Sequence, residues 1–138
     1  MKRFIKTIEM LSVCFLLTNC KTNRTVNGFK HGKWVLKDTI NTVVYKQVAF
    51  YKNGEEVRKW KTYKDDKKYK TEKYKKEICL VTFYHPNGKV AVKGQTKQEV
   101  SDKQIHWFYD GDWFLFDEKG KLTATKIYEN GKLMNDFD

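Results

Sequence analysis

The feature that most constrains the fold of this 138-residue chain is a glycine-turn frame that recurs along it. The clearest copy, over residues 110–133, reads DGDWFLFDEKGKLTATKIYENGKL. In it, a Gly and a Trp precede an aromatic segment of strand length, a Gly turn, a second such segment and an Asn-Gly turn. Glycines at fixed offsets supply the positive φ angles that tight turns need. The frame therefore predicts successive β-hairpins.

Three short frames within this stretch each occur twice in the chain. They are Tyr-x-Asn-Gly at 51–54 and 128–131, aromatic-x-x-x-Gly-Lys at 84–89 and 116–121, and Gly-x-Trp at 32–34 and 111–113. Stacked hairpins of this kind are typical of a repeat array. The residues that we assign to the repeat architecture are Gly32, Trp34, Gly54, Gly88, Gly111, Trp113, Gly120, Tyr128 and Gly131.

Between the turns, β-branched and aromatic residues form segments of strand length. The expected strands are residues 42–51, 56–63, 78–84, 89–94, 104–109, 113–116 and 121–128, with turns at 52–55, 85–88, 110–112, 117–120 and 130–131. Residues 95–103 are polar and carry no clear assignment. No 3.6-residue apolar pattern persists beyond the N-terminal segment, so the sequence predicts a single all-β domain at 28–138.

The frames resemble MORN-type repeats, in the bacterial variant found in YwqK-type antitoxin proteins and in many secreted lipoproteins. The resemblance is carried by Asn27-Gly28, residues 31–34, 111–114, 120–122 and 128–133. It is good over 110–133, fair over 27–57 and 83–94, and it fails over 58–77 and 95–104. It implies a single MORN-like sheet of successive antiparallel β-hairpins that acts by binding, without catalysis. It does not imply one partner.

The N-terminus has the features of a secretory signal. Lys2, Arg3 and Lys6 precede an apolar run at 10–17 and a small, polar exit. The run is shorter than the roughly 20 residues that a membrane-spanning helix needs. Two alternatives remain open beside a lipoprotein signal: an ordinary signal peptide with a chance cysteine, and a cytoplasmic first helix.

The end of this signal, Leu17-Thr18-Asn19-Cys20, also resembles a bacterial lipobox. The resemblance implies cleavage before Cys20 and lipidation of its thiol. We therefore expect a lipoprotein signal peptide at 1–19 and a tether at 20–27. The expected location is the bacterial cell envelope, lipid-anchored at the outer membrane or facing the periplasm.

The cysteine count fits this processing. Cys14 would leave with the signal and Cys20 would carry lipid, so Cys79 alone would remain and no intramolecular disulfide could form. Cys79 lies in an apolar run at 78–81. The run predicts a small buried side chain and not a nucleophile.

Residues 58–77 interrupt the repeat with a basic insertion, which we expect to be a long hairpin tip or an exposed helical turn. Its basic residues are Arg58, Lys59, Lys61, Lys64, Lys67, Lys68, Lys70, Lys73, Lys75 and Lys76. With interleaved aromatics, they could bind an anionic surface through phosphates or acidic sugars. The alternative, which we favour, is a solvated loop whose lysines keep a sheet edge soluble. The net charge of +11 permits acidic partners, but a lipid-anchored protein is not expected to meet nucleic acid.

The sequence contains no pattern typical of an active site. His31, His85 and His106 do not have metal-ligand spacing, and a zinc site at Cys79 and His85 would need about two further ligands. No P-loop, Gly-x-Ser-x-Gly or HExxH motif is present. We expect no catalysis, metal or cofactor, although an enzyme with an unrecognised site remains an alternative.

These observations predict a non-catalytic, lipid-anchored binding or structural module of the cell envelope. It would be held to the membrane by its N-terminal lipid and would contact a protein or an acidic envelope component. The alternative, which follows from the YwqK resemblance, is an antitoxin-like immunity protein that neutralises a toxin by direct binding.

Overall fold

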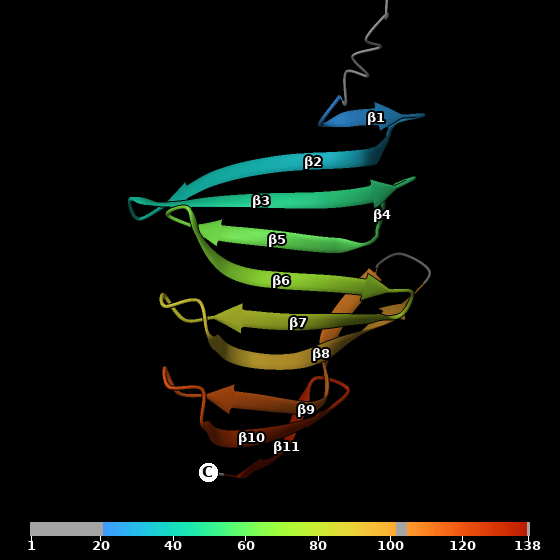
Figure 1. Cartoon of the computed structure of the whole chain (residues 1–138). Helices are drawn as coiled ribbons and strands as arrows, with labels where there is room; N and C mark the ends of the chain where they lie inside the picture. Colours follow the sequence, from blue (N-terminus) through green and yellow to red (C-terminus); the bar gives the residue numbers. More distant parts are fainter. Residues whose placement is uncertain (1–20, 102–104, 138) are drawn as a thin grey trace, which may run out of the picture.

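The structure, a computed structural model, describes residues 21–101 and 105–137. Over these residues the chain is all β, with eleven strands and no helix (Figure 1). The strands are β1 (Arg24–Val26), β2 (Phe29–Ile40), β3 (Val43–Lys52), β4 (Glu55–Glu56), β5 (Lys59–Lys64), β6 (Lys67–Lys75), β7 (Ile78–Tyr84), β8 (Val90–Val100), β9 (Ile105–Phe116), β10 (Leu122–Glu129) and β11 (Lys132–Phe137).

All eleven strands belong to one open antiparallel sheet, and their order in space follows their order in the chain. Only β4 leaves this path, because it pairs with the end of β3 before β5 pairs with the same strand. β1 and β11 form the two free edges, at opposite ends of the stack in Figure 1. The prediction of successive antiparallel hairpins in a single sheet is confirmed.

Two-residue turns with positive φ at both central residues join five of the strand pairs. The Asn-Gly pairs at 27–28, 53–54 and 130–131 have this conformation, whose twist matches that of the paired strands. Asn41-Thr42 and Asp65-Asp66 adopt it without glycine. The conformation is strained for a β-branched residue such as Thr42. Asn-Gly therefore predicts these turns, but other residue pairs can form them.

The turns at 85–88 and 117–120 have a second form. In each, the glycine N–H donates to the carbonyl three residues earlier, at 2.9 Å. The Asp117 carboxylate also accepts hydrogen bonds from the backbone N–H groups of Lys121 (2.8 Å) and Lys119 (2.9 Å). These bonds lower the pKa of the Asp117 carboxyl, because they stabilise its charged form.

The predicted turn at 110–112 is wrong, because β9 runs through it as one strand. The pairing of β8 with β9 shifts there, so that three residues of β9 lie opposite Gly94 alone. Gly111, at φ 68°, lies within this bulge. A Cβ on Gly94 would lie 2.3 Å from the Trp113 ring. The bulge thus lets the Trp113 side chain fold directly over the backbone of β8.

The basic segment at 58–77 is neither a protruding tip nor a helical turn, which corrects that expectation. It forms β5 and β6, which pair with each other and with β3 and β7 inside the sheet. Arg58 has φ 64° two residues before Trp60, where the other two Gly-x-Trp copies have glycine. The repeat therefore continues through this segment, with an arginine at its left-handed position.

Strand structure also covers segments that carried no strand assignment, namely β1, β2, the second half of β8 and β11. β1 lies within the predicted tether at 20–27, because the Asn27-Gly28 turn brings the chain back to pair with β2. β8 continues to Val100 through polar residues and pairs there with β9. Backbone pairing needs no apolar pattern, so composition did not reveal these additions.

The register divides the side chains between two faces, because directly opposed residues of paired strands share a face. One of them, which we call the aromatic face, carries all four tryptophans. It also carries the most deeply buried apolar residues, Ala49, Trp60, Cys79, Val81 and Trp113. No helix or second sheet covers this face in the part of the chain that the structure describes. Its rings therefore pack mainly on one another.

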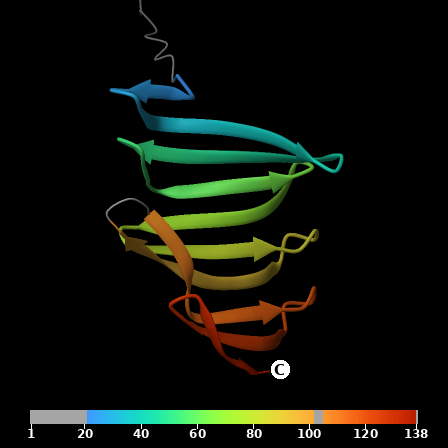
Figure 2. The ribbon, with the colours of Figure 1, turned by 180° about the vertical axis from the view of Figure 1, so that it is seen from behind.

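A row of ring contacts crosses the aromatic face. The ring centroids are 6.1 Å apart for Trp34–Tyr51, 4.9 Å for Tyr51–Trp60, 4.8 Å for Trp60–Tyr74 and 5.6 Å for Tyr74–Trp107. The last contact brings the first half of β9 onto β6. In Figure 2 this half of β9 crosses in front of β6, β7 and β8. The β8–β9 hairpin thus folds over one end of the aromatic face.

The residues assigned to the repeat architecture have structural roles. All six glycines have φ between 68° and 91°. The indole N–H groups of Trp34 and Trp113 donate to the backbone carbonyls of Arg24 and Gln95, each at 3.1 Å. The Tyr128 ring packs against Trp113 at 6.3 Å.

Candidate functional site

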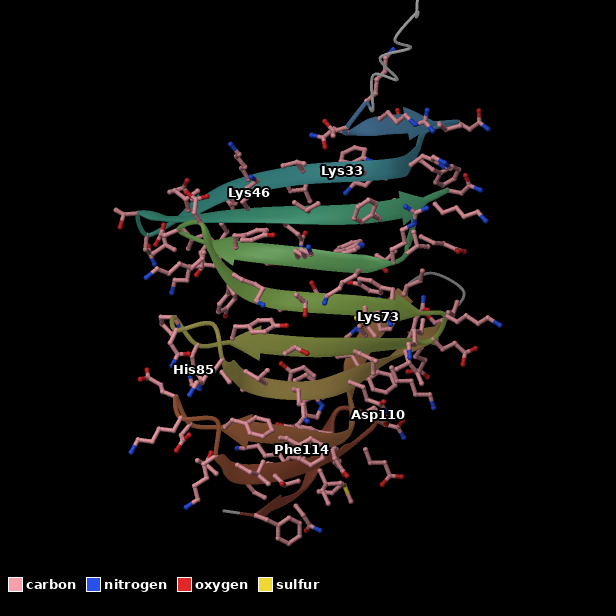
Figure 3. All side chains as sticks on the ribbon, viewed as in Figure 1. Lys33, Lys46, Lys73, His85, Asp110 and Phe114 are labelled. Carbon is pink, nitrogen blue, oxygen red and sulfur yellow. The ribbon has the colours of Figure 1, made fainter. Side chains whose placement is uncertain are left out.

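The second face of the sheet carries a field of lysines that we call the lysine face. Its cross-strand pairs link Lys33 with Phe50, Val48 with Lys61, Lys61 with Thr71, Thr71 with Thr82 and Thr82 with Lys93, so the field continues from β2 to β8. By this register the lysine face comprises Lys33, Lys37, Lys46, Lys59, Lys61, Lys68, Lys73, Lys75, Lys93 and Lys97. All of them are exposed except Lys46, which is half-buried. Figure 3 labels Lys33, Lys46 and Lys73 on β2, β3 and β6.

These lysines lack counter-charges in the described structure. Its two ion pairs, Lys70–Glu72 and Lys126–Asp136, involve none of them. The acids that the register places on the same face, Glu55, Glu99, Asp110 and Asp112, make no ion pair with them. Lys52 shares the face but lies directly opposite Glu55.

Two pairs on this face place lysine directly opposite lysine, namely Lys37 with Lys46 and Lys59 with Lys73. Like charges in directly opposed positions destabilise a sheet. An external anionic surface would relieve this repulsion, because it would supply the missing negative charge.

The structure brings together part of the predicted basic set and separates the rest. Lys59, Lys61, Lys73 and Lys75 lie on the lysine face. Lys68 lies on the same face, opposite Tyr63 and 3.9 Å from the Tyr84 ring centre, and the Arg58 guanidinium packs there over the Phe50 ring (5.6 Å). The remaining members lie elsewhere: Lys70 pairs with Glu72 (3.0 Å), Lys64 and Lys67 are opposed beside the β5–β6 turn, and Lys76 lies in the β6–β7 turn.

Sequence reasoning missed the lysines that other strands add to this face: Lys33, Lys37, Lys46, Lys93 and Lys97. They are dispersed over the chain and join the field only through strand register. The available signal was alternation, since lysines two or four residues apart within one strand share a face.

The aromatic face holds the groups whose pKa values are most perturbed. Burial, followed by repulsion from Glu72, raises the pKa of the Cys79 thiol to about 12. Cys79 is 2% exposed, which confirms the prediction of a small buried side chain. Burial likewise raises the pKa values of Tyr74, Tyr51 and Glu56. A thiol with this pKa is protonated at neutral pH and is a weak nucleophile.

The histidines lie apart and have local partners. His85 Nε2 lies 2.8 Å from the Phe116 carbonyl oxygen, and His31 Nδ1 lies 3.2 Å from Asn53 Oδ1. The His106 ring contacts Phe108. Among the described residues, no three His, Cys, Asp or Glu side chains are grouped so that they could hold a metal ion.

Residues 1–19 and Cys20 lie outside the described residues, so the predictions of a signal peptide and of lipidation stay predictions. The described part of the chain includes no helix that is long and apolar enough to span a membrane. Comparison with protein families, with curated proteins and with solved structures finds no match to this chain.

Proposed function

We propose that this protein is a non-catalytic binding module of the cell envelope, lipid-anchored at Cys20 and built from MORN-like repeats. Its lysine face binds an acidic envelope component, for which the anionic head groups of the anchoring membrane are the nearest source. The observation that supports this function most strongly is the uncompensated charge of the lysine face.

The energetics favour a broad anionic surface over a single small anion. The lysines are spread over β2 to β8, so each one would meet a different group of the partner. A lysine near an anionic membrane contributes about 1 kcal/mol. A few such contacts, added to an acyl anchor, would hold the sheet against the surface. Because exposed charges are screened by salt, this attraction should weaken as ionic strength rises.

The test compares two double charge reversals in the same hairpin. Lys59→Glu/Lys73→Glu changes an opposed lysine pair on the lysine face, whereas Lys64→Glu/Lys67→Glu changes an opposed pair on the aromatic face. Both variants change the net charge equally. Each is made in full-length Cys20→Ala protein, so that acyl chains contribute nothing. Binding to phosphatidylglycerol-containing vesicles is measured, with binding to neutral phosphatidylcholine vesicles subtracted.

We expect the first variant to lose about 10- to 100-fold in vesicle affinity, at about 1 kcal/mol per lysine, and the second to lose much less. Equal losses would mean that net charge alone attracts the protein, and the lysine face would be rejected as the binding surface. Fatty-acid labelling that is lost in the Cys20→Ala variant tests the anchor separately.

A further inference from the structure

A groove lies on the aromatic face, where the β8–β9 hairpin folds over the sheet. Its volume is about 610 Å³, within the usual range for ligand sites. Glu56 from β4, Tyr74 from β6, and Gln98 and Trp107 from the β8–β9 hairpin are among the residues that line it. We call it the Glu56 groove. It lies on the face opposite the lysine face and does not depend on the function proposed above.

The Glu56 groove has a negative side-chain charge although the protein as a whole is basic. Among the residues that line it, Glu56 and Glu77 contribute two carboxylates against a single lysine, Lys76, whereas the side chain of Glu55 belongs to the lysine face. The Glu56 carboxylate is half-buried and has no ion pair with any described residue. Lys30 attracts this carboxylate electrostatically, but no described cation lies within ion-pair distance of it.

Two further polar atoms near the Glu56 carboxylate have no hydrogen bond of ordinary geometry. Glu72 repels Glu56 electrostatically; its Oε1 bonds Lys70 at 3.0 Å, but its Oε2 is buried without a hydrogen-bond partner. The buried Trp107 indole N–H also closes no hydrogen bond of ordinary geometry, although it interacts with the Glu56 carboxylate. Leaving such groups without hydrogen bonds is unfavourable in a folded protein. A cation bound at the Glu56 carboxylate would offset its repulsion from Glu72.

The aromatic row already holds a cation at its other end. Lys30 Nζ lies 5.0 Å from the Trp34 ring centre and 4.9 Å from the Tyr51 ring centre. No described lysine or arginine occupies the equivalent position over Tyr74 or Trp107. Aromatic faces attract cations, and planar guanidinium both stacks on rings and pairs with carboxylates through two parallel hydrogen bonds.

We propose that the Glu56 groove binds a guanidinium group, stacked against Tyr74 and Trp107 and paired with the Glu56 carboxylate. The group is presented either by an arginine side chain of another protein or by a small free guanidine. Both sources share the planar cation that this arrangement recognises.

The test uses the full chain in detergent and Nα-acetyl-arginine methylamide as the probe. The matched probe is its citrulline counterpart, which has the same shape but no charge. Binding is followed by titration calorimetry and by the NMR signal of the Trp107 indole N–H, assigned with Trp107→Phe. We expect saturable binding on the order of 1 mM for the arginine probe, since one side chain supplies all the contacts. The citrulline probe should bind at least tenfold more weakly.

Two isosteric substitutions separate the groove from general charge effects. Glu56→Gln should weaken arginine binding at least tenfold, whereas Glu118→Gln, at an exposed position in the 117–120 turn, should leave it unchanged. Melting curves confirm that both variants fold. Absence of saturable binding, equal binding of citrulline or equal effects of the two substitutions would overturn the proposal.

A further titration with methylguanidine distinguishes the two sources. Methylguanidine that binds as tightly as the arginine probe supports a free guanidine, and weaker binding supports an arginine side chain. Loss of vesicle binding in the lysine-face variants leaves this proposal unaffected, because those substitutions lie on the opposite face.

Discussion

At the scale of single residues, the fold depends on close approaches between glycine and tryptophan. A Cβ added to Gly94 would lie 2.3 Å from the Trp113 ring, and this ring is buried, so it cannot move aside easily. We expect Gly94→Ala to cost about 2–4 kcal/mol, because either the ring or the β8 backbone must move. Urea unfolding followed by tryptophan fluorescence measures this cost.

Gly88→Ala is the matched control for that substitution. Gly88 has φ 84°, but an added Cβ there would meet nothing within 4 Å, so only backbone strain of about 1–2 kcal/mol applies. Combining Gly94→Ala with Trp113→Leu should cost less than the sum of the two single changes. Additive costs would show that the Trp113 ring is not what Gly94 accommodates.

The Glu56 carboxyl predicts a pH dependence of stability. Burial, with repulsion from Glu72, raises its pKa above the ordinary value of 4.5. The folded state therefore binds this proton more tightly than the unfolded state, so the carboxyl favours folding most at low pH. That contribution is lost as pH rises from about 4.5 through the folded-state pKa. Glu56→Gln should melt increasingly higher than wild type over that range.

The control for this pH effect is Glu118→Gln, at the exposed position in the 117–120 turn. Its melting temperature should follow that of the wild type at each pH. A difference between Glu56→Gln and wild type that stays constant with pH would contradict the assignment to the Glu56 carboxyl.

At the scale of strands and turns, the opposed lysines of the lysine face lower the stability of the sheet, because their charges repel. Lys46→Glu would place a carboxylate directly opposite Lys37 and replace a repulsive pair with an attractive one. We expect it to stabilise the protein by about 0.5–1 kcal/mol in urea unfolding. Lys52→Glu should instead destabilise it by a similar amount, because it would oppose Glu55. Destabilisation by both substitutions would show that the opposed lysines do not repel.

Turns could be predicted from sequence where one residue type dictates the backbone, as in Asn53-Gly54 and Asn130-Gly131. The prediction was wrong at Gly111, because a glycine with positive φ serves a bulge as well as a turn. It also missed the repeat at Arg58, where an arginine adopts the left-handed conformation two residues before Trp60. The lysine face could not be predicted, since membership depends on the register of several strands at once.

At the scale of the whole molecule, strands pair with their neighbours in the chain, apart from the β3–β5 pairing, and the contact of Tyr74 with Trp107 is a longer-range one between β6 and β9. Central strands have partners on both sides, whereas β1 and β11 are fully exposed edge strands. We expect amide exchange to be slowest over β5–β8 and to quicken stepwise toward both edges, as in other nearest-neighbour arrays. Hydrogen exchange with mass spectrometry measures this profile. Uniform protection across the sheet would contradict it.

The sequential strand order also bears on how such a chain can change over generations. A duplication or deletion of one hairpin adds or removes two strands, so every later residue keeps its face. The sheet would become longer or shorter by two strands, while its lysines and its aromatic rings stayed on their respective faces. Changes of this kind can therefore alter the length of the sheet, and the area of its two faces, while the fold stays the same.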